Sequence, residues 1–171
     1  MKGYIHVYTG NGKGKTTAAI GLSIRAVGAN KKVFFAQFVK GKKYSEVKTI
    51  QQFLPTITIK QYGLDCFIYQ KPKHEDVEAA RKGLKEVSEI IMSGTYDMVV
   101  LDEANIAMYY KLFCVEELIE LLKRKPENVE VIITGRNAPD ELIEIADLVT
   151  EMKEIKHYYT KGVQARMGIE H

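Results

Sequence analysis

The chain has 171 residues, of which 46% are apolar and 27% charged, and this ordinary globular composition argues against disorder. No apolar stretch approaches the roughly 20 residues of a membrane-spanning helix, so we expect no membrane partner. The two cysteines, Cys66 and Cys114, form no CxxC pair, which argues against a disulfide framework or a zinc ribbon and fits a reducing cytoplasm. We interpret both as small buried side chains.

The charge is distributed unevenly along the chain. The net charge is only +3, but none of the first 45 residues is acidic and nine of them are lysine or arginine. This asymmetry indicates that the N-terminal part receives an anion, although lysines on a solvated face would give the same count.

Strand and helix patterns alternate from the first residues to the last. We expect strands at residues 4–9, 32–39, 56–61, 98–101, 129–134 and 148–152. We expect helices at residues 16–27, from Ser45 to before Pro55, at 74–93, at 115–123 and after Pro139. With no repeat or linker, this rhythm of unbroken apolar strands predicts one α/β domain over residues 1–171. Its sheet is mainly parallel, with about six strands flanked by helices.

The strongest motif is the glycine-rich run Thr-Gly-Asn-Gly-Lys-Gly-Lys-Thr-Thr at residues 9–17, between a predicted strand and a predicted helix. That context is typical of a phosphate-binding loop, a variant one because Thr9 stands where the usual pattern has glycine. Lys15 would contact the terminal phosphates, the Thr16 hydroxyl would ligate Mg²⁺, and Lys13 adds a second cation. The candidate phosphate-binding residues are Gly10, Asn11, Gly12, Lys13, Gly14, Lys15, Thr16 and Thr17. The alternative is a glycine-rich turn without a ligand.

Two carboxylates, Asp102 and Glu103, directly follow an apolar strand. At the carboxyl end of a central strand they could reach a Mg²⁺ ion already held by Thr16 and a nucleotide. Alone, the pair could equally cap a helix; with the glycine-rich loop upstream, a ligand role is favoured.

Two further segments follow the second and third strands and belong to the same predicted sheet edge. One carries Lys40; the other, residues 62–69, is rich in aromatic side chains that could stack on a flat ligand or simply pack together. The residues alone therefore indicate a magnesium-nucleotide protein with a second ligand. They leave open a P-loop kinase and a nucleic-acid-stimulated ATPase. A kinase would need an acceptor base and an arginine-rich lid, which we do not find. Because most of the basic charge lies in or beside the loop, we expect no nucleic-acid partner.

Several segments closely resemble those of the ATP:corrinoid adenosyltransferases that act on cob(I)alamin. The resemblance is collinear over almost the whole chain, and its most diagnostic part is the C-terminal one. It is carried by residues 10–19, 25–28, 37–41, 100–103, 131–136, 146–152 and 161–170.

The resemblance implies transfer of the 5′-deoxyadenosyl group of ATP to Co(I) of a reduced corrinoid, with release of triphosphate. It implies a recombinase-like P-loop fold, a homodimer, and a flavoprotein reductant. Mg²⁺, which Mn²⁺ can replace, would be the cofactor, and a cobalamin or cobinamide would be the substrate.

The same resemblance assigns roles to individual residues. It makes Arg25 a nucleotide contact and places Thr16 and Glu103 at the Mg²⁺ site. Phe67 and Tyr69 fall where the family has aromatic side chains that keep the lower base off cobalt, which would make them catalytic together with Lys15.

Overall fold

Six parallel strands form a single sheet in this computed structural model, which describes residues 2–42, 44–64 and 71–170. The sheet order is β3-β2-β4-β5-β1-β6. The strands are β1 (Ile5–Thr9), β2 (Val33–Phe38), β3 (Ile57–Tyr62), β4 (Met98–Asp102), β5 (Glu130–Thr134) and β6 (Leu148–Glu151). The helices are α1 (Lys15–Gly28), α2 (Ser45–Phe53), α3 (His74–Ser93), α4 (Ala104–Tyr109), α5 (Val115–Lys123) and α6 (Asp140–Ile145), with a 3₁₀ turn, η1 (Tyr158–Lys161).

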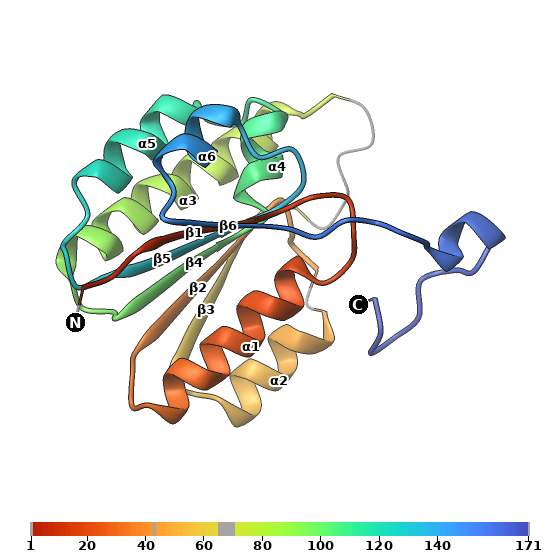
Figure 1. Ribbon diagram of the computed structural model, residues 1–171, viewed down its shortest axis with the longest axis horizontal. Coiled ribbons are helices and arrows are strands. Elements are labelled where there is room, and N and C mark those ends of the chain that lie inside the picture. The colour runs from red at the N-terminus through yellow and green to blue at the C-terminus, as the bar shows by residue number, and fades with distance from the viewer. Residues whose placement is uncertain (1, 43, 65–70, 171) are drawn as a thin grey trace.

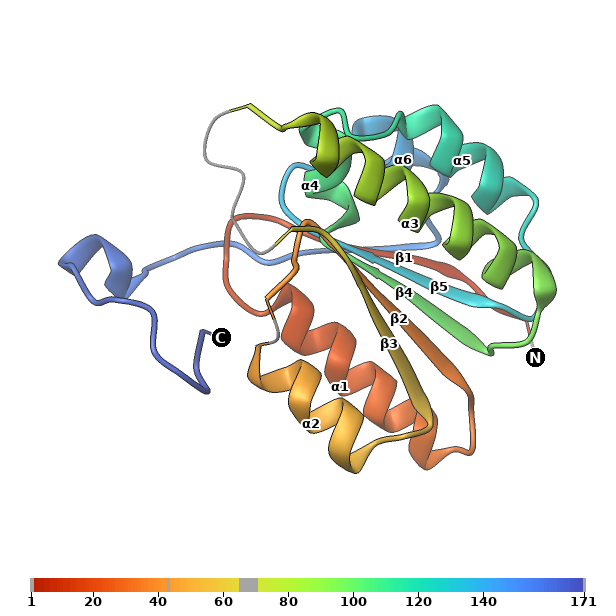
Figure 2. The same cartoon turned by 180° about the vertical axis from the view of Figure 1, so that it is seen from behind.

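Helices cover both faces of the sheet. Figures 1 and 2 show α1 and α2 on one face, and α3, α4, α5 and α6 on the other. Every side chain of β2 is buried, and the strand alternates between the two faces: Phe34 and Phe38 pack in the core beneath α3, whereas Val33 and Phe35 pack against α1. Burial on both faces explains why the central strands read as continuous apolar runs.

The predicted architecture, one α/β domain with a parallel sheet of about six strands, is confirmed and is consistent with a P-loop type fold. The predicted helices 74–93 and 115–123 have the same bounds in the structure, and the other predicted elements agree to within one or two residues at each end. Helix α4 was not predicted. It has only 6 residues and follows β4 after the single residue Glu103, so it offers too little periodic pattern to be distinguished from a turn.

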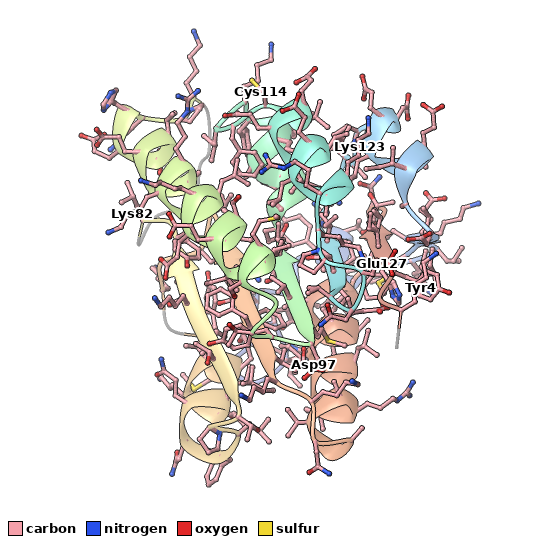
Figure 3. All side chains as sticks on the ribbon, turned by 90° about the vertical axis from the view of Figure 1, so that its left-hand side faces the viewer. Tyr4, Lys82, Asp97, Cys114, Lys123 and Glu127 are labelled. Carbon is pink, nitrogen blue, oxygen red and sulfur yellow. The ribbon has the colours of Figure 1, made fainter. Side chains whose placement is uncertain are left out.

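The prediction that Cys114 is buried is wrong, because this side chain is exposed. Cys114 lies at the outer surface at the start of α5 (Figure 3), where it is the N-cap residue and its backbone N–H donates to the Glu117 carboxylate over 2.8 Å. Cys114 is therefore exposed because it caps the start of α5, and the pattern of apolar residues does not reveal such a capping role. Cys66 lies outside the described residues.

The strand order determines which segments meet at the carboxyl edge of the sheet. Strand β5 lies between β1 and β4, so the loop after β1 and the two carboxylates at the end of β4 lie on either side of the end of β5. The turn after β2 lies beside β4 at the same edge. Open α/β sheets bind their ligands at this edge.

Candidate functional site

The glycine-rich loop, residues 10–14, joins β1 to α1 and curls against the chain that follows β6. The backbone N–H of Gly12 donates to the carbonyl of Met152 over 2.7 Å, and a Cβ on Gly12 would come within 2.6 Å of that carbonyl oxygen. Gly10 is as crowded, at 2.5 Å from the same oxygen, and has a φ of +94°. Close backbone approach as well as positive φ therefore requires glycine in this loop.

Helix α1 begins directly after the loop, and its first turn suits an anion. Gly14 is the N-cap in the left-handed conformation, with no capping side chain, and the first turn contains no acidic residue. Its initial N–H groups are thus left for a ligand, and the helix dipole is positive there. Asn11 and Thr17 are exposed at this end, where a ligand can reach them.

Lys15 folds over the loop. Its ammonium donates to the carbonyls of Gly10 and Gly12, each over 2.7 Å, and the residue is 8% exposed. Burial lowers its pKa, and the charge of nearby Arg136 acts in the same direction, whereas Glu103 and Asp102 oppose the shift. Lys15 is thus a cation held at the loop by carbonyl groups that an anionic ligand could replace.

Thr16 and Asp102 lie together, as predicted. The Thr16 hydroxyl donates to Asp102 Oδ1 over 2.8 Å, and Thr134 of β5 donates to the same oxygen over 2.7 Å. Asp102 is fully buried, which would raise its pKa, but the charge of Lys40 and the hydrogen bonds from Thr134 and Thr16 outweigh burial and lower it. Asp102 is therefore a charged carboxylate at neutral pH.

Glu103 lies beside this pair in a backbone conformation that few non-glycine residues adopt. Its φ is +59°, and its backbone N–H donates to the Thr134 hydroxyl over 3.1 Å. Burial and the neighbouring charge of Asp102 raise the pKa of its carboxyl group. Non-glycine residues held in this region concentrate at functional sites, because the surrounding structure must compensate for the strain.

The donors at this edge fit a magnesium ion bound together with a nucleotide. Among the described residues no three His, Cys, Asp or Glu side chains cluster closely enough to hold a metal by themselves. Mg²⁺ in nucleotide sites needs only one or two protein oxygens, since phosphates and water supply the rest. The oxygens of Thr16 and Asp102 already share a cation in this structure, the Lys40 ammonium, which is the chemistry such a site requires.

The structure does not bring every predicted residue to this edge. Arg25 is exposed in the last turn of α1, ten residues after Lys15, which corresponds to about 15 Å along the helix. It could contact a nucleotide only if the nucleoside extended along α1. Phe67 and Tyr69 lie outside the described residues.

Sequence reasoning missed several residues of this edge. Gln37 donates to Asp102 Oδ2 over 3.3 Å, and Arg136 acts on the pKa values of both Lys15 and Glu103. The residues around Thr134 form no motif that would indicate a role in the site, so the sequence does not predict it. The position of Lys40 after a strand predicts that it lies at this edge, but it does not predict the contact with Asp102.

The carboxyl-terminal residues fold back to the loop. Lys13 donates to the Ile169 carbonyl over 2.8 Å, to Glu170 Oε1 over 2.9 Å and to the Tyr158 hydroxyl over 3.3 Å. The segment containing η1 projects from the domain and returns to the side on which the loop lies (Figure 1). The segment whose sequence is most diagnostic of the resemblance therefore contacts the glycine-rich loop.

A glycine-rich loop between a strand and a helix, facing a carboxylate on a neighbouring strand, is typical of P-loop-like nucleotide-binding proteins. Comparison with known proteins narrows this class. The family model described as ATP:corrinoid adenosyltransferase BtuR/CobO/CobP matches residues 1–171, and the chain belongs to this family.

Three relatives illustrate the similarity. The corrinoid adenosyltransferase of Escherichia coli K12 is 36% identical over 171 residues, covering 99% of this chain and 86% of the relative. The corrinoid adenosyltransferase of a Sinorhizobium species is 37% identical, covering 99% of this chain and 80% of the relative. That of Pseudomonas aeruginosa is 31% identical, covering 99% and 84%. None of the described helices is long and apolar enough to cross a membrane.

Proposed function

We propose that this protein transfers the 5′-deoxyadenosyl group of ATP to the Co(I) centre of a reduced corrinoid and releases tripolyphosphate. The observation that carries the proposal is the match of the adenosyltransferase family to residues 1–171, which includes the loop, the carboxylates and the carboxyl-terminal segment. Co(I) supplies the electron pair of the new cobalt–carbon bond. The C5′–oxygen bond breaks, and its electron pair leaves on the triphosphate.

The charges around the loop support this chemistry. The reaction develops negative charge on the leaving oxygen of the triphosphate, and preorganised cations lower the energy of such a transition state. Lys15 lies against the loop, Lys13 lies within it, and Arg136 is close enough to affect the pKa of Lys15. The reaction requires no base, because Co(I) is itself the nucleophile.

The metal cofactor of the proposed reaction is Mg²⁺, which Mn²⁺ can replace. Thr16 and Asp102 would hold it, with Glu103 beside them, and it would neutralise charge on the phosphates. In the same proposal Gly10, Gly12 and Gly14 shape the loop, Asn11 and Thr17 line its opening, and Arg25 contacts the nucleotide. We further propose a homodimer in the cytoplasm, reduced corrinoid supplied through a flavoprotein, and a cobalamin or cobinamide as the acceptor.

One experiment tests the reaction against its alternatives. The protein is incubated with Mg-ATP and chemically reduced cobalamin, and the phosphorus products are identified by phosphorus NMR while adenosylcobalamin is followed by absorbance. We expect intact tripolyphosphate, formed in step with adenosylcobalamin. Stoichiometric ADP would overturn the proposal in favour of a P-loop kinase. ADP formation that depends on added nucleic acid would instead favour a stimulated ATPase.

A further inference from the structure

Lys40 reaches the carboxylate edge through a strained turn. It follows Val39, a β-branched residue with a φ of +60°, a conformation that such residues rarely adopt. The turn is held by a hydrogen bond of 3.2 Å from the Val39 N–H to the Tyr62 carbonyl. The backbone of Gly63 packs so closely that a Cβ there would lie 2.5 Å from the Lys40 nitrogen. The fold therefore maintains an unfavourable backbone conformation where it directs this side chain.

The Lys40 ammonium lies between the two oxygens proposed to hold the metal. It is 3.0 Å from Asp102 Oδ2 and 3.4 Å from Thr16 Oγ1, and its side chain is 16% exposed. Lys40 and the fully buried Asp102 carboxylate therefore form an ion pair. A cation thus lies beside Asp102 in this structure.

Two cations cannot share this carboxylate closely without strong repulsion, and a buried ammonium without a counter-ion is costly. When a metal ion binds to Asp102 and Thr16, the Lys40 ammonium must therefore pair with another anion. The phosphate chain beside the loop is the anion that arrives with the metal.

We propose that Lys40 is a third lysine of the triphosphate site. In the nucleotide-free protein it is the counter-ion of Asp102 and competes with the metal; when the metal–nucleotide complex binds, its ammonium passes to the phosphate chain and stabilises the leaving group. This inference rests on the proposed function only for the identity of that anion.

If the Lys40 ammonium moves from Asp102 to the phosphate chain, Lys40→Met should change two binding affinities in opposite directions. This substitution removes the charge and keeps most of the side-chain volume. Without nucleotide, Mn²⁺ should bind about tenfold more tightly, because Asp102 loses its competing cation. With Mg²⁺ present, inorganic tripolyphosphate should bind about tenfold more weakly, because one of its cations is gone. Electron paramagnetic resonance of free Mn²⁺ gives the first affinity, and titration calorimetry the second.

Lys42→Met is the matched control, since it removes the same charge from an exposed residue two positions away. We expect it to change either affinity by less than about twofold. Lys40→Arg keeps the charge and should retain most of the tripolyphosphate affinity. Thermal unfolding shows whether Lys40→Met is folded; if it is not, Lys40→Gln replaces it with the same two expected signs.

Unchanged affinities in a folded Lys40 variant, or two affinities that fall together, would overturn the proposal and make Lys40 an ordinary structural ion pair. Neither measurement uses a corrinoid or ATP. If the protein failed to form adenosylcobalamin but showed the two opposite changes, the proposed reaction would be wrong and the role of Lys40 would stand.

Discussion

The ammonium of Lys13 lies 2.9 Å from Glu170 Oε1, so an ion pair between residues 157 positions apart joins the glycine-rich loop to the carboxyl-terminal segment. Glu170 also accepts hydrogen bonds from the Tyr158 hydroxyl and from Arg166, whose guanidinium lies 4.9 Å from the centroid of the Tyr158 ring. The hydrogen bonds from Tyr158, Lys13 and Arg166 hold the pKa of the Glu170 carboxyl far below its usual range. A triphosphate that uses Lys13 must therefore compete with a permanently charged carboxylate.

Glu170→Gln should consequently favour nucleotide binding. We expect the KM for Mg-ATP to fall by about two- to fivefold, a modest change because the Lys13 side chain is exposed to solvent. Trypsin should also cleave faster after Arg166, since the segment loses its strongest partner at the loop. Glu144→Gln, the same change on the exposed side of α6, serves as the control. A KM and a cleavage rate that both match the control would show that Lys13 does not depend on this contact.

Lys15→Ala should remove charge stabilisation from the triphosphate, and kcat/KM should fall by about 10²–10³. Thr16→Ala should weaken the dependence of the rate on Mg²⁺, because a hydroxyl ligand is lost. Steady-state kinetics at varied Mg-ATP test both variants, with the exposed Lys85→Ala as the control. Near wild-type turnover of both at saturating Mg-ATP would contradict the assignment of the phosphate loop.

The sequence predicts where the helices and strands lie along the chain better than it predicts which of them lie side by side in the fold. Apolar spacing locates α3, and the glycine-rich motif locates the turn between β1 and α1, because both signals are local. Thr134 joins the site only because β5 lies between β1 and β4, and strand order is set by packing between distant segments. The contact between Lys13 and Glu170 likewise has no local signal. Lys40 is an intermediate case: its place after a strand predicts the edge, but the strained turn at Val39 decides that it reaches Asp102.

The aromatic residues Phe67 and Tyr69 can be tested although they lie outside the described residues. Co(II) becomes easier to reduce once it loses its axial ligands, and an apolar ring in place of the lower base would favour this. Phe67→Ala and Tyr69→Ala should therefore slow turnover of Co(II) substrate with a protein reductase much more than turnover of chemically reduced Co(I). Paramagnetic resonance of the Co(II) complex with Mg-ATP checks the cause. A four-coordinate signal that is unchanged in both variants would remove these residues from the site.

Asp97 should give the folded protein a pH-dependent contribution to stability. It lies at the start of β4 (Figure 3), where its carboxylate accepts from the Lys32 backbone N–H over 2.9 Å and pairs with Lys31 at 3.2 Å. The Lys32 hydrogen bond, helped by the charge of Lys31, lowers its pKa in the folded state. This contribution is therefore fully present above the unfolded-state pKa of about 3.9 and is lost as the pH falls through the folded value.

Asp97→Asn should thus destabilise the protein at pH 7 by about 1 kcal/mol, because the Lys32 N–H exchanges a charged acceptor for a neutral amide oxygen. Loss of the solvent-exposed pair with Lys31 adds little. The difference in unfolding free energy from wild type, measured by urea titration, should shrink as the pH is lowered below the unfolded-state pKa. A difference that does not vary with pH would mean that the charge of Asp97 contributes nothing.

Two glycines in helices, Gly83 and Gly21, have opposite surroundings. Gly83 lies in α3 against the ring of Tyr62, and a Cβ there would come within 2.5 Å of the Tyr62 Cγ. Gly21 lies in α1, and a Cβ there would meet nothing within 4 Å. Alanine favours a helix over glycine by about 1 kcal/mol at either position, so only the contacts distinguish them.

Gly21→Ala should therefore stabilise the protein by about 0.5–1 kcal/mol. Gly83→Ala should destabilise it by about 1–2 kcal/mol, because overpacking against a ring fixed in the core exceeds the gain in helix propensity. Urea unfolding of the two variants beside wild type gives both signs in one experiment. Because Tyr62 ends β3, where the chain enters the aromatic segment, Gly83→Ala should also lower the rate with Co(II) substrate, whereas Gly21→Ala should not. Equal stabilisation by both substitutions would show that the helix can shift to accept the methyl group, and that the close packing of α3 on Tyr62 does not constrain this end of the sheet.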